Sequence, residues 1–83
     1  MLATEARKNA SEVIWDSLPS IIRYNIEDAI NNGKLKCEIR FDDDKMDMDK
    51  FNECTKRFQD LDELGYIPMM NKVYDKHVIT IMW

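Results

Sequence analysis

The densest group of side chains able to do chemistry is an acidic run that begins at Asp42. From Asp42 to Glu53 it spans twelve residues, the length of a calcium-binding loop, and carboxylates fill its first, third and last positions. The other positions do not fit, because Met46 replaces an oxygen ligand, Asp47 stands where the turn needs glycine, and Lys50 adds positive charge. We therefore expect neither a specific metal site nor a bound cofactor.

Two interpretations of this acidic run remain open. The simpler one is a solvated loop followed by a helix N-terminus, where the helix dipole favours negative charge. The alternative is a docking surface that binds a basic groove of another protein. The carboxylates of that surface would be Asp42, Asp43, Asp44, Asp47 and Asp49.

No other residue pattern indicates catalysis. His77 is the only histidine, and the sequence shows neither a partner that would orient it nor a nucleophile that it would activate. Two glycines are too few for a glycine-rich phosphate loop when both are needed to end helices. We expect the protein not to be an enzyme.

The two cysteines, Cys37 and Cys54, have sixteen residues between them and form no metal-binding spacing. Each falls on the apolar side of an expected element, so we interpret both as reduced core thiols. A disulfide or a thiol nucleophile is the alternative.

The composition limits the classes of partner that the protein is expected to bind. The 83 residues carry a net charge of −4, and the basic residues are scattered, which argues against direct binding to nucleic acid. No apolar stretch approaches the length of about 20 residues that a membrane span needs. The start of the chain has no basic region followed by an apolar core, so we expect a protein that stays in the cytosol.

The two glycines mark where helical periodicity changes to strand alternation. Gly33 separates an expected helix over residues 19–31 from a strand over residues 34–41. Gly65 ends a third helix, expected over about residues 47–64, before strands over residues 66–73 and 77–83. An amphipathic helix over residues 4–17 precedes these elements and would serve as an oligomerisation or docking arm.

These elements predict one α+β domain over residues 1–83, with two layers and the order α-α-β-α-β-β. Pro68 cannot donate to a strand ladder, so the second strand belongs at an edge, while the third is apolar on both faces and belongs in the middle. The predicted sheet is therefore a three-stranded mixed sheet with strand order 1-3-2.

One face of this sheet would be apolar and without helices to cover it. We expect either the first helix or another subunit to lie against it. Large side chains that would anchor a partner are Trp15, Met69, Met70 and Trp83.

Four segments resemble small tailed-bacteriophage accessory proteins of unknown function: Thr4-Glu5-Ala6-Arg7, Ile26–Ile30 before Gly33, Leu61–Tyr66, and Ile79–Trp83. The resemblance covers most of the chain and rests on folding signals, whereas Pro68 and the acidic run depart from the usual pattern. It implies a phage accessory or virion protein and transfers no catalytic residue.

Two functional hypotheses follow. The first is a non-enzymatic phage-encoded protein that binds a host protein in the bacterial cytoplasm and inhibits or redirects it. The second is a structural virion or assembly protein that acts as a homo-oligomer. The expected partner is accordingly a host protein or a second copy of the chain.

Overall fold

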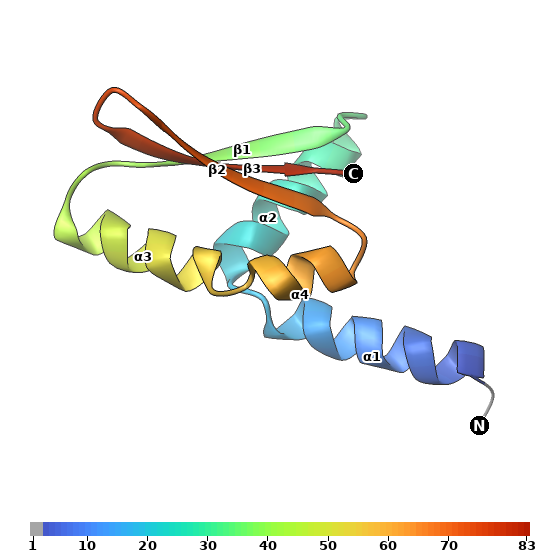
Figure 1. The fold of residues 1–83 in the computed structure, drawn as a ribbon. Helices are drawn as coiled ribbons and strands as arrows, with labels where there is room; N and C mark the ends of the chain where they lie inside the picture. The colour runs from blue at the N-terminus through green and yellow to red at the C-terminus, as the bar shows by residue number, and fades with distance from the viewer. Residues whose placement is uncertain (1–2) are drawn as a thin grey trace.

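The computed structural model describes the backbone of residues 3–83 and the side chains of residues 10–83. The Thr4–Arg7 side chains of the phage resemblance lie outside the described residues. The elements are α1 (Ala3–Ser17), α2 (Ser20–Asn31), β1 (Lys36–Phe41), α3 (Lys45–Thr55), α4 (Phe58–Glu63), β2 (Ile67–Val73) and β3 (Lys76–Met82). Figure 1 shows α2, α3 and α4 on one side of the sheet, while α1 extends away from it.

The three strands form one sheet with the order β1-β3-β2, which confirms the α+β prediction and its strand order. The sheet is antiparallel and not mixed as predicted, because β3 runs antiparallel to both of its neighbours and no two parallel strands are paired. Ile39 of β1 and Met70 of β2 both lie opposite Ile79 of β3, so these three residues cross the sheet in one row.

Both glycines end a helix in the expected way. Gly33 has φ +70° and Gly65 has φ +91°, a left-handed conformation that other residues adopt at a cost. After α2, the amide of Gly33 donates to Ile30 and that of Lys34 donates to Ala29. The amides of Gly65 and Tyr66 repeat this pattern after α4, so each helix ends in a Schellman motif.

The single helix expected over residues 47–64 is divided into α3 and α4, so that prediction was wrong. The amide of Arg57 bonds to the carbonyl of Cys54, three residues back, which tightens the chain where α3 ends. The Thr55 hydroxyl also bonds to the Asn52 carbonyl, an alternative to regular helical bonding that threonine offers. The break lets α4 turn separately toward β2.

The core lies between the helices and one face of the sheet. Cys37, Ile39 and Phe41 alternate with exposed residues along β1, so every second side chain enters it. The buried cluster consists of Leu18, Ile22, Ile26, Ala29, Cys37, Ile39, Phe41, Cys54, Leu61, Ile79 and Ile81. Because these residues come from every element that packs on the sheet, the helices and strands are held by one shared core.

Candidate protein interface

The other face of the sheet is open. Among residues 3–83, no helix lies against it, and α1 reaches the domain at a different place, where Trp15 packs near Tyr66. We call this surface the open face. It carries the side chains that alternate with the core residues: Lys36, Glu38 and Arg40 of β1, Ile67, Met69, Asn71 and Val73 of β2, and Val78, Thr80 and Met82 of β3.

The chemistry of the open face changes from one edge to the other. On β2, Ile67, Met69 and Val73 are exposed, and Met69 presents 48% of its surface to solvent. On β1, the Glu38 and Arg40 side chains lie 3.7 Å apart as an exposed ion pair. The open face therefore has an apolar strip on one edge strand and a charged strip on the other, with β3 between them. Protein interfaces use this combination for anchoring and for orientation.

A hollow of about 410 Å³ lies at the hairpin end of the open face. Its lining includes Arg40, Val73, Tyr74 and Val78. Val78 is buried although it faces away from the core, because Arg40 and Asn71 flank it in the same row. The hollow thus combines an apolar floor with a wall of mixed charge, to which Arg40, Lys76, Glu38 and Asp75 contribute.

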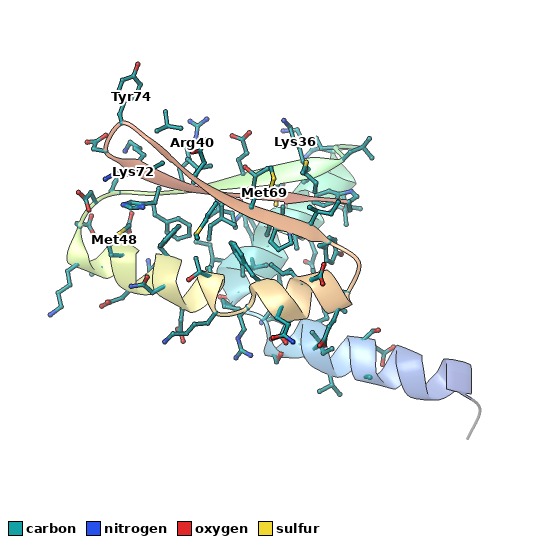
Figure 2. The ribbon with its side chains drawn as sticks, viewed as in Figure 1. Lys36, Arg40, Met48, Met69, Lys72 and Tyr74 are labelled. Carbon is teal, nitrogen blue, oxygen red and sulfur yellow. The ribbon has the colours of Figure 1, made fainter. Side chains whose placement is uncertain are left out.

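Tyr74 occupies the two-residue turn between β2 and β3 and was not among the residues chosen from the sequence. Its φ of 58° is left-handed, which is unfavourable for a side chain of this size, and 94% of its surface is exposed. Figure 2 shows it standing out from the tip of the hairpin. A strained, fully exposed aromatic residue beside an apolar strip is a functional candidate.

The four large side chains chosen from the sequence are not brought together. Met69 lies on the open face, whereas Met70 points to the opposite side of β2 and is also exposed. Trp15 and Trp83 are both half-buried and pack against Tyr66, with ring centroids 6.5 Å and 5.9 Å from it. Of the four, Met69 is the one that belongs to the open face.

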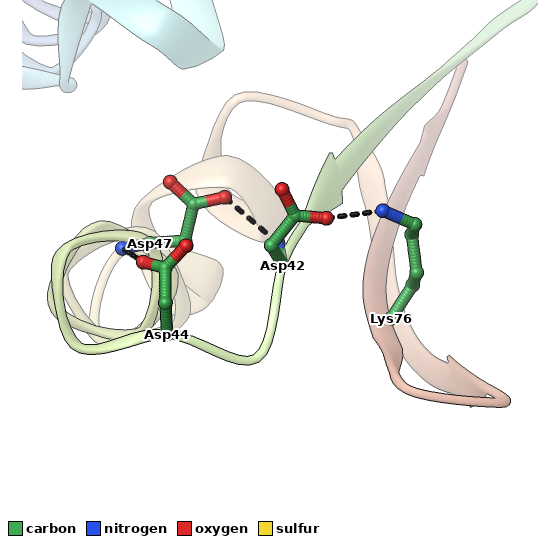
Figure 3. A network of polar contacts seen from close by, with 4 residues as sticks. All are labelled: Asp42, Asp44, Asp47 and Lys76. Atoms are coloured by element: carbon green, nitrogen blue, oxygen red, sulfur yellow. Dashed lines mark hydrogen bonds and ion pairs between the residues drawn. The ribbon is translucent and has the colours of Figure 1, made fainter.

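The acidic run forms a small network of internal contacts at the start of α3 (Figure 3). The Asp44 carboxylate accepts a hydrogen bond of 2.8 Å from the Asp47 amide and so caps α3. The Asp47 carboxylate accepts a hydrogen bond of 2.7 Å from the Asp42 amide. The Asp42 carboxylate also forms an ion pair with Lys76, and this contact raises the pKa of the lysine. The loop-and-helix interpretation accounts for these three carboxylates.

The oxygens of Asp42, Asp44 and Asp47 can lie within 4.8 Å of one another, close enough for a cation. Their contacts, however, are those of a loop and a helix cap. Asp43 lies 3.9 Å from the imidazole of His77, and Asp49 is exposed on α3. A docking role for the run remains a prediction.

Of the remaining reactive groups, the two cysteines are buried in the core and His77 is partly buried. Cys37 and Cys54 are both free thiols, and burial raises the pKa of each, that of Cys54 to about 11. Since the thiolate is the reactive form, this environment disfavours nucleophilic chemistry at neutral pH. His77 packs against the ring of Phe51, with the ring centroids 5.0 Å apart.

Across residues 3–83, no helix is long and apolar enough to cross a membrane. Comparison of the chain with protein-family models, with curated proteins and with solved structures gave no match. The resemblance to phage accessory proteins therefore stays a prediction, and the open face is the feature from which function is argued.

Proposed function

We propose that this protein is a non-enzymatic binding domain that takes a protein partner on the open face of its sheet. The observation that carries the proposal is the exposed apolar strip of Ile67, Met69 and Val73, which has no helix over it in the described part of the chain. Apolar side chains gathered on one uncovered face are typical of protein interaction sites.

The partner's chemistry follows from the two strips. An apolar side chain would rest on Met69 and Val73, and Tyr74 would cover it from the hairpin tip. Glu38 and Arg40 would orient the partner through complementary charges at the rim. The phage resemblance makes a bacterial host protein, bound in the host cytoplasm, the partner to be sought first.

A recovery experiment from bacterial lysate tests this proposal. The immobilised chain should retain a specific protein, and Met69→Lys should reduce its recovery at least tenfold, because a lysine charge would have to be buried in the apolar contact. Met46→Lys is the matched control, since Met46 lies on α3, away from the open face, and is 70% exposed. Recovery with this control should be unchanged.

A third variant separates stability from binding. Tyr74→Asn should stabilise the fold by about 0.5–1 kcal/mol, because asparagine tolerates the left-handed turn better, while it weakens partner recovery. Equal recovery by the wild type, Met69→Lys and Tyr74→Asn would show that the partner binds elsewhere. Thermal melting of each variant confirms that it is folded.

The second hypothesis, a homo-oligomer with a structural role in a virion or its assembly, is favoured by a separate observation. That observation concerns the edge of β1 rather than the open face.

A further inference from the structure

The two outer edges of the sheet present different backbone groups. The Trp83 amide donates to the Leu35 carbonyl at 3.1 Å, which identifies these opposite residues as a directly bonded pair. Bonded pairs alternate along antiparallel strands, so the amides of Cys37, Ile39 and Phe41 face β3. The alternate amides on β1 consequently point out of the sheet. These are the amides of Lys36, Glu38 and Arg40.

The free edge of β2 is protected. The same alternation directs the backbone nitrogens of Pro68, Met70 and Lys72 outward. Pro68 has no amide hydrogen, and the Lys72 amide donates to the side chain of Asn71 at 2.9 Å. Only the Met70 amide is left to pair with another strand. Natural sheets avoid edge association by blocking an edge strand in this way.

The free edge of β1 carries charged side chains, but its outward amides are not blocked in this way. In the described part of the chain, no acceptor takes the outward amides of Lys36, Glu38 and Arg40. A groove of about 810 Å³ runs beside this edge, lined by Asn25 and Asp28 of α2 as well as by Lys36 and Glu38. The edge is therefore both unpaired and accessible to another strand.

The charges along this edge identify the strand that fits it. Lys36, Glu38, Arg40 and Asp42 alternate in sign at every second residue, positive first and negative last. Reading the segment in the reverse direction exchanges the signs. An antiparallel copy of the same segment thus presents an opposite charge to each of these residues.

We propose that the β1 edge pairs with the β1 edge of a second copy of this chain, antiparallel and centred on Ile39. In this register Glu38 lies opposite Arg40 of the second copy, and Lys36 lies opposite its Asp42. The two Glu38–Arg40 pairs contribute about four backbone hydrogen bonds, as bonded antiparallel pairs do. The two three-stranded sheets become one continuous sheet.

The charges also exclude the neighbouring registers. A shift by two residues in one direction places Glu38 opposite Glu38 and Lys36 opposite Arg40. A shift in the other direction places Arg40 opposite Arg40 and Glu38 opposite Asp42. Like charges directly opposite one another destabilise a strand pair, so the register centred on Ile39 is the one favoured.

This pairing shares the Glu38 and Arg40 side chains with the function proposed for the open face, but it does not use the apolar strip. It uses the backbone edge and leaves Met69 and Val73 exposed on the outer strand of each copy. Met69→Lys should therefore reduce partner recovery at least tenfold without changing self-association, so this variant distinguishes failure of one proposal from failure of the other.

Sedimentation equilibrium of purified protein at low salt tests the pairing, over concentrations from about 1 µM to about 1 mM, which cover weak to moderate affinities. The wild type should shift from its monomer mass of 9.9 kDa to twice that mass. Glu38→Arg alone and Arg40→Glu alone should each associate at least tenfold more weakly, because each places like charges opposite one another. Both sites are exposed, so the fold should be retained.

Mixing the two variants is the sharpest arm of the experiment. One chain carrying Glu38→Arg and one carrying Arg40→Glu are complementary in the proposed register, so an equimolar mixture should regain the dimer mass. A wild type that stays monomeric throughout would overturn the proposal. So would single variants that dimerise as well as the wild type, or a mixture that remains monomeric.

Discussion

Replacing Ile79 by alanine is expected to cost about 2–5 kcal/mol of unfolding free energy, the range for large-to-small changes in a packed core. Ile79 is fully buried in the middle strand, with Ile39 and Met70 on either side of it. Strands on both sides prevent the cavity from collapsing. A domain of this length has a total stability of about 4–12 kcal/mol, so this substitution alone should leave it marginally folded.

Ile67→Ala is the matched control, because it removes the same atoms from the opposite face of the sheet. Ile67 is 56% exposed, and the change should cost within about 0.5 kcal/mol. Urea denaturation of both variants, followed by circular dichroism, gives the comparison. Similar losses at the two positions would mean that the open face is covered, contrary to the fold described above.

Proline at Ile39 is expected to cost about 3 kcal/mol or more beyond the loss of the isoleucine side chain. The Ile39 amide faces β3, so proline removes a hydrogen bond within the sheet. Ile39→Ala measures the side-chain part separately. The difference in unfolding free energy between the two variants therefore isolates the contribution of the backbone.

Glu38→Pro, one residue away, should remain folded. Its amide points out of the sheet, the orientation that the nitrogen of Pro68 has on the opposite edge. The proline ring should cost about 1 kcal/mol of local strain, and it should prevent the dimer from forming. If Glu38→Pro lowered the unfolding free energy as much as Ile39→Pro does, the assigned direction of the β1 amides would be contradicted.

Much of the architecture could be predicted because single residues have strong local effects. Gly33 and Gly65 both adopt the left-handed conformation that ends a helix. Pro68 placed β2 at an edge, and the charged and apolar residues of β1 alternate in burial as they do in sequence. These signals do not depend on what packs against them.

Other features depend on contacts between distant segments and were not predictable from one sequence. The division between α3 and α4 interrupts an apolar spacing that is compatible with one continuous helix. Tyr74 has no intrinsic preference for a left-handed turn and is held there by the register of β2 and β3. Likewise, the sequence left open whether the first helix covers the sheet, and Figure 1 shows α1 away from it.

Within the candidate site, the sequence identified Met69 and the existence of an uncovered apolar face. The residues of β3 that lie on this face came from the structure, which places Val78 and Met82 on the open face and Ile79 in the core. The contrast between the two sheet edges needed the hydrogen-bond register. Only the register shows which amides point outward.

Amide hydrogen exchange at Glu38 and Arg40 tests most directly whether the β1 edge is open and pairs with itself. In dilute solution these two amides should exchange rapidly while those of Ile39 and Phe41 are protected. At concentrations that give the dimer, Glu38 and Arg40 should become protected, whereas Met70 on the other edge should not. Protection of Glu38 and Arg40 in the dilute monomer, or rapid exchange in the dimer, would contradict the proposed edge pairing.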